Sequence, residues 1–156
     1  MAIKPTEELP FSEDDLAPIE AVLTELTKAG RGWVNFSPEV EVGHEPPPRN
    51  LLATIFSARG EVVPLATWTP PDEPGKRATL GIEHGSGPKA IARLIEHELP
   101  LAPGWFKVVD HPRRGLVVTA PATAPLTDVV WWLLAASHAL SRVPLTGDWL
   151  AKIYRT

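Results

Sequence analysis

Residues 127–143 have the sequence TDVVWWLLAASHALSRV, which predicts a long helix near the end of the chain. Thr127 or Asp128 can cap its first turn, and Pro144 ends it. One apolar face is formed by residues three and four positions apart: Leu126, Val129, Val130, Leu133, Leu134, Ser137 and Leu140. Because Trp131 and Trp132 fall largely outside this face, the helix must be covered on more than one side.

Length and composition limit the class of protein. A chain of 156 residues suits a single domain, 1–156, which can bury a full core without metals or disulfides. Its 44% of apolar and 22% of charged residues are typical of globular proteins. The net charge of −4 argues against nucleic-acid or anionic-membrane binding, since both need a basic surface. The absence of cysteine excludes disulfides, thiol catalysis and thiolate metal sites.

No targeting or membrane segment is evident. The N-terminal residues 1–8 are too acidic and too polar for a signal peptide. The longest apolar run, inside the C-terminal helix, falls short of the roughly 20 residues that span a bilayer. We therefore expect a soluble cytoplasmic protein.

The N-terminal part predicts an arm and then a helix. Residues 1–11 suggest a loose arm. Ser12 can act as an N-cap, and the three acidic residues after it favour the positive end of the helix dipole. Leu16, Ile19, Leu23 and Leu26 then mark one helical face. This helix would end at Gly30 or Gly32, since glycine readily adopts the left-handed conformation of a helix end.

The remaining apolar runs predict strands and two further helical segments. Strands are expected at 33–36, 51–56, 61–69, 77–83, 105–109 and 116–120. The proline-rich segment 37–50 predicts a long loop, and 57–60 predicts a hairpin connection. A short helix would present Ile91, Leu94, Ile95 and Leu99 on one face. Residues 146–154 predict one more short helical segment.

These elements predict an α+β domain. Adjacent hairpins imply an antiparallel sheet of about five strands with helices packed on it, in the order α-β-β-β-α-β-β-α. A parallel α/β sheet would need helices between successive strands, and most of these strands lack them.

This order of elements resembles the type III secretion chaperone-like fold, a small antiparallel domain that is often dimeric. The resemblance covers about residues 12–143 and includes a final helix opened by a Thr-Asp pair, as at Thr127-Asp128. It implies a non-enzymatic bacterial protein-binding, adaptor or chaperone-like domain that forms a homodimer. The proline-rich loop 37–50 and the C-terminal segment depart from the family's pattern.

The turn EHGSGPKA at 83–90 suggests a different function. Backbone N–H groups at a helix N-terminus can bind a phosphate or another small anion, and Lys89 could add positive charge. A simpler interpretation is that Ser86 or Gly87 caps the helix and Pro88 takes its first position. The spacing matches neither the P-loop nor the dinucleotide-binding fingerprint.

No catalytic or metal-binding motif is complete. The five histidines do not form HxH, HxxxH or HExxH patterns, and no G-x-S-x-G sequence is present. His138, inside the apolar helix, could titrate or simply bond a backbone partner. We therefore predict no cofactor, no metal and no catalytic residue, with an enzyme of unrecognised class as an alternative.

The six tryptophans are the strongest sign of a binding surface. Adjacent helical residues point about 100° apart, so Trp131 and Trp132 cannot both lie at the centre of one face. We expect one of them at an interface with a second copy of the chain or at a groove for a protein or peptide partner. The candidate binding residues are Trp131, Trp132, Trp68, Ser86, Lys89 and, for an acidic peptide, Arg113 and Arg114.

Overall fold

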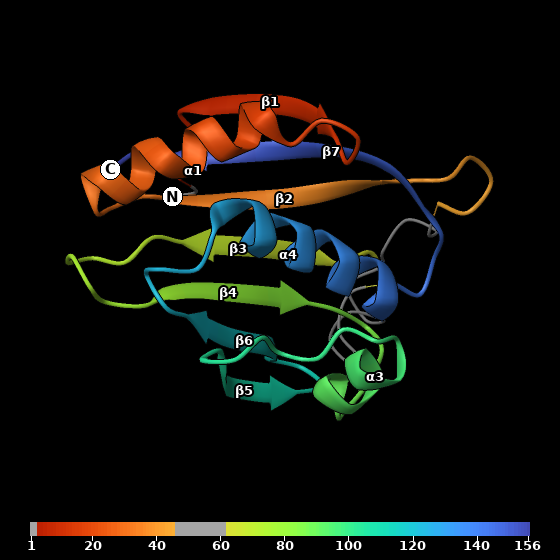
Figure 1. Ribbon diagram of the computed structural model, residues 1–156. Helices are drawn as coiled ribbons and strands as arrows, with labels where there is room; N and C mark the ends of the chain where they lie inside the picture. The colour runs from red at the N-terminus through yellow and green to blue at the C-terminus, as the bar shows by residue number, and fades with distance from the viewer. Residues whose placement is uncertain (1–2, 46–61) are drawn as a thin grey trace.

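The computed structural model describes residues 3–45 and 62–156 of the chain. These residues form a seven-stranded antiparallel sheet and three helices, so the domain is α+β. In Figure 1, α1 and α4 cross one face of the sheet, and α3 lies beside the end that carries β5. No helix in the described residues is both long and apolar enough to cross a membrane.

The chain order of the elements adds one strand at each end of the predicted order. The elements are β1 (Glu7–Ser12), α1 (Ala17–Ala29), β2 (Trp33–Val40), β3 (Leu65–Thr69), β4 (Ala78–Glu83), α3 (Ala90–Glu96), β5 (Phe106–His111), β6 (Gly115–Ala120), α4 (Leu126–Leu140) and β7 (Leu145–Tyr154). The strands lie in the order β1-β7-β2-β3-β4-β6-β5. The predicted number of about five strands is therefore wrong, and the order of the elements in the described residues differs from the predicted one.

The core lies between the helices and the facing side of the sheet. The predicted alternation in β4 is confirmed, because Ala78, Leu80 and Ile82 are buried while Thr79 and Glu83 are exposed. The predicted apolar face of α4 is confirmed as well. All of its predicted residues are buried except Leu126, which is half-buried, and Trp132 and Ala136 of α4 are buried in addition.

The predicted loose arm at 1–11 is wrong for residues 7–11, which belong to β1. This strand pairs with β7 from Glu7 opposite Ile153 to Ser12 opposite Asp148. Phe11 is buried in the core, whereas the other residues of β1 are exposed or half-buried. Charged residues and a proline are typical of an edge strand, where one side of the backbone needs no strand partner.

The predicted helix at 146–154 is also wrong, because these residues lie in β7. Trp149, Ala151 and Ile153 are buried in alternation with half-buried neighbours, as a strand between β1 and β2 requires. Arg155, the residue that follows β7, anchors the C-terminal end of this strand. Its guanidinium forms ion pairs with Glu7 of β1 and Glu25 of α1, and its hydrogen bond lowers the pKa of Glu25.

The predicted loop at 37–50 is wrong at its start. β2 continues to Val40, and a register shift in its pairing with β7 lies between Pro38 and Val40. Such an irregularity accommodates a proline within a strand. The end of that loop, the predicted strand 51–56 and the connection 57–60 lie outside the described residues.

A turn, not a helix, contains the acidic residues that follow β1. The Ser12 hydroxyl accepts a hydrogen bond from the Asp14 backbone N–H, and Asp15 accepts one from Ala17. Helix α1 begins only at Ala17, so the prediction of Ser12 as its N-cap is wrong. Its predicted end at Gly30 is confirmed by a left-handed φ of 68°. This turn places Glu13 and Asp14 beside α4.

Candidate functional site

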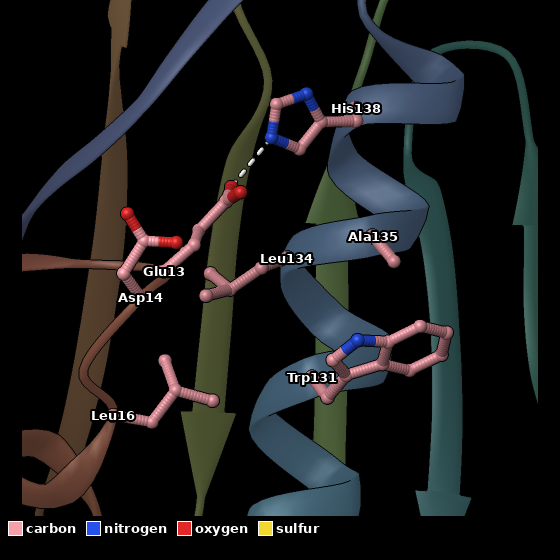
Figure 2. A pocket seen from close by; sticks show the side chains of 7 residues that line it. All are labelled: Glu13, Asp14, Leu16, Trp131, Leu134, Ala135 and His138. Carbon is pink, nitrogen blue, oxygen red and sulfur yellow. Dashed lines mark hydrogen bonds and ion pairs between the residues drawn. The ribbon is translucent and has the colours of Figure 1, made fainter.

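A pocket of about 420 Å³ lies between α4 and the turn that joins β1 to α1 (Figure 2). We call it the α4 groove. It is lined by Glu13, Asp14, Leu16, Trp131, Leu134, Ala135 and His138. Its volume falls within the range of pockets that hold ligands, about 300–1,000 Å³.

One carboxylate fixes the acidic end of the α4 groove. Glu13 Oε1 accepts a hydrogen bond from His138 Nε2 at 2.5 Å and another from Trp149 Nε1 at 2.8 Å. The Trp149 ring lies edge-on to the imidazole of His138, with 6.2 Å between ring centres. Glu13 therefore connects the β1–α1 turn to α4 and to β7.

The opposite end of the α4 groove is aromatic. Trp131 is 57% exposed, whereas its neighbour Trp132 is 5% exposed. Trp131 precedes His138 by seven residues, which corresponds to about 10 Å along a helix axis. In Figure 2, Leu16 lies across from Trp131, and Glu13 and Asp14 lie across from the upper turn of α4. The groove therefore changes from acidic to aromatic along its length.

A histidine and a carboxylate meet at the acidic end of the α4 groove. A histidine beside a carboxylate can move protons. Here His138 Nε2 and Glu13 Oε1 are bonded to each other, and the same oxygen also receives the Trp149 N–H. These bonds link three elements and hold the wall of the groove in place.

The tryptophans that were predicted as binding residues differ in their exposure to solvent. Trp131 lies at a groove and Trp132 in the core, as the angle between adjacent helical residues requires. Trp132 packs edge-on against Trp105, with 5.6 Å between ring centres. Trp68 is fully buried in β3. The prediction that Trp132 and Trp68 are surface contacts is therefore corrected, because neither side chain is accessible.

The turn at 84–89 differs from the predicted helix cap. The N-cap of α3 is Lys89, at a left-handed φ of 62°, and not Ser86 or Gly87. The backbone N–H groups of Ala90 and Ile91 donate to the Asp110 carboxylate at 3.0 and 3.1 Å. An anion bound at the N-terminus of α3 would need these same backbone N–H groups, which Asp110 already occupies. The negative charge of Asp110 would also repel the anion. The anion-binding hypothesis remains a prediction, but this geometry disfavours it.

His84 is a buried histidine in the same turn. It is 1% exposed, and its Nδ1 accepts hydrogen bonds from the backbone N–H and the hydroxyl of Ser86. Its Nε2 has no hydrogen-bond partner among residues 3–45 and 62–156. Burial lowers the pKa of His84; the charge of Asp110 opposes this shift and that of Arg93 adds to it.

We expect His84 to make the protein less stable at acidic pH. Below pH about 6.5 the unfolded chain binds a proton at this histidine, whereas the folded chain resists it, so the free energy of unfolding falls. The free energy of unfolding stops falling once the pH lies below the lowered pKa of His84 in the folded state, because His84 is then protonated in both states. Urea unfolding at pH 7.5 and 5.5 measures this decrease. In His84→Asn, whose amide oxygen can replace Nδ1, the decrease should be smaller; an unchanged decrease would assign it to other groups.

The remaining candidates lie away from the α4 groove. Arg113 and Arg114 are exposed in the β5–β6 turn, and their backbone N–H groups donate to His111 Nδ1. Ser86 and Lys89 belong to the turn before α3 and do not line the groove. The described part of the chain contains no group of three or more residues that could hold a metal ion.

Sequence reasoning missed the acidic end of the site. Glu13 and His138 are 125 positions apart, and no motif links them. The only signal was the acidic run after Ser12, which is equally typical of a helix start. Comparisons with protein-family models, curated proteins and solved structures find no match for this chain.

Proposed function

We propose that this protein is a non-enzymatic protein-binding module and that the α4 groove is its binding surface. The observation that supports this most is the exposed indole of Trp131 at the rim of a pocket with an apolar floor. Tryptophan is enriched among the residues that contribute most to protein binding. An adaptor or chaperone-like role, which the resemblance of the predicted element order implies, would use such a surface.

The walls of the α4 groove are held in place before any partner arrives. Leu134 belongs to the buried face of α4, and Glu13 bonds both His138 and Trp149. A preformed site binds more tightly, because less conformational freedom is lost on association. This rigidity favours recognition of a flexible partner segment by a fixed surface.

The size of the α4 groove favours a short segment over a folded partner. Stable interfaces between folded proteins bury about 800 Å² on each side. Trp131 is the only large apolar residue of the groove that is exposed; Leu16 is half-buried and Leu134 is buried. Most of the apolar surface of α4 is already covered within the chain. The homodimer expected from the sequence remains a prediction, and a second copy is the competing occupant of this surface.

Peptide selection tests the proposed function. A random library of short peptides is displayed against the immobilised full chain, and the affinities of recovered peptides are measured for two variants. Trp131→Ala should weaken binding by about 30-fold, as for a residue contributing about 2 kcal/mol. Ile95→Ala is the matched control, because Ile95 is also 57% exposed but does not line the groove. Thermal unfolding checks that both variants remain folded.

Two outcomes would overturn the proposal. Recovery of no peptides, or of peptides equally sensitive to both variants, would remove the α4 groove as the binding surface. A wild-type dimer that dissociates in Trp131→Ala, seen by molar mass in solution, would assign this surface to a second copy of the chain.

A further inference from the structure

We infer that the α4 groove recognises a segment with two features: a basic side chain at the acidic end and a large apolar side chain against Trp131. This inference rests on the proposed function and specifies the chemistry of its partner. The basic residue would be arginine in preference to lysine.

The acidic end carries negative charge that the fold leaves available. Glu13 Oε1 is occupied by His138 and Trp149. Neither Glu13 Oε2 nor the Asp14 carboxylate has a hydrogen-bond partner within residues 3–45 and 62–156. A guanidinium carries five N–H donors in a fixed plane and can bond carboxylates through two of them at once. Arginine therefore complements this end better than the single ammonium of lysine.

The aromatic end selects a different side chain. Trp131 is exposed, Leu16 lies across the groove from α4 in Figure 2, and Ala135 lies on the next turn of α4. Covering an exposed indole with an apolar or aromatic group removes apolar surface from water, which is favourable in proportion to the area covered. A leucine, methionine or aromatic side chain of the partner suits this end.

The distance between the two ends sets the spacing in the partner. Trp131 and His138 are about 10 Å apart along α4. In a polyproline II segment, residues three positions apart lie on the same edge and about 9 Å apart. If the partner segment is a helix, its basic and apolar side chains must be about seven positions apart to span the same distance. Selected peptides should therefore share a basic and an apolar residue at one of these two spacings.

The charge of the protein supports a partner other than itself. The chain has a net charge of −4, and two neighbouring carboxylates, Glu13 and Asp14, line the groove. Like charges across an interface are unfavourable, whereas a basic segment would be attracted from a distance. The groove is therefore more complementary to a basic segment than to a second copy of this chain.

Charge changes at Asp14 test the inference without disturbing the fold. The Asp14 side chain makes no described hydrogen bond, so Asp14→Asn should leave stability unchanged. Peptides from the selection should bind this variant about threefold to tenfold more weakly, and Asp14→Lys more weakly still. Asp72→Asn and Asp72→Lys change the net charge equally at an exposed loop outside the groove, and should have less than a twofold effect.

The peptide provides the second half of the test. Replacing its basic residue by glutamine should weaken binding to wild type by about the same factor, with no further loss in Asp14→Asn. Binding that depends on Trp131 but not on Asp14 or on a basic residue would overturn this inference and leave the proposed function standing. A selection that recovers no peptide would overturn both.

Discussion

Replacing Glu13 with alanine is expected to lower the free energy of unfolding by about 3 kcal/mol. The substitution removes the acceptor for both His138 and Trp149, two side chains on different elements. Trp149 is 3% exposed, so its indole N–H would be left buried without a partner. A buried polar group that loses its partner costs about 1–3 kcal/mol, and the lost bond to His138 adds to this. Chemical unfolding of the two proteins measures the difference.

Three variants test whether the stability lost in Glu13→Ala comes from its hydrogen bonds or from the removal of a negative charge. Asp14→Ala removes a neighbouring carboxylate that makes no described bond, and should change stability by less than about 0.5 kcal/mol. Glu13→Gln retains an acceptor oxygen, so its loss should be smaller than that of Glu13→Ala. In a Trp149→Phe background, Glu13→Ala should cost less, because no indole N–H remains to be satisfied. Equal losses for Glu13→Ala and Asp14→Ala would contradict the proposed connection.

The two adjacent tryptophans of α4 should respond to substitution in opposite ways. Trp132→Ala is expected to lower the free energy of unfolding by about 3–5 kcal/mol, because it leaves a cavity beside Trp105 in the core. Trp131→Ala should change it by less than about 1 kcal/mol, since that side chain is mostly exposed. Urea unfolding of both variants compares the two effects. Similar losses would mean that α4 is rotated about its axis relative to the orientation described here.

Sequence periodicity predicted the elements whose buried face is continuous. In β4, apolar residues alternate strictly, and in α4 they recur at helical spacing over four turns. The end of α1 followed from Gly30, because a left-handed residue there favours glycine. Such local signals agree with the tertiary structure, and they gave both the α+β class and the antiparallel sheet.

The two missed strands had ambiguous local signals. β1 combines two glutamates with a proline, a composition that a loose arm shares with an edge strand. In β7, Trp149 and Ile153 are four positions apart, which fits a helical face as well as a strand. Ala151 between them supports the strand, but alanine is also the best helix former. Pairing between the two ends of the chain decides in favour of the sheet.

The candidate site was predictable only at its aromatic end. The angle between adjacent helical residues placed one of Trp131 and Trp132 at a groove or an interface, and local geometry alone sufficed for that. The acidic end depends on a turn of the chain that brings Glu13 to His138, from the opposite end of the sequence. A contact of this kind leaves no trace in composition or spacing.

Chemical-shift mapping of a selected peptide on the isotope-labelled protein tests the central claim most directly. We predict saturable shifts of the Trp131 indole N–H and of methyl groups of Leu16, Leu134 and Ala135, with the resonances of Phe106 and Val108 unchanged. These two residues are exposed apolar side chains on β5, at the other edge of the sheet from β1. Shifts confined to β5, with none at the α4 groove, would contradict the account.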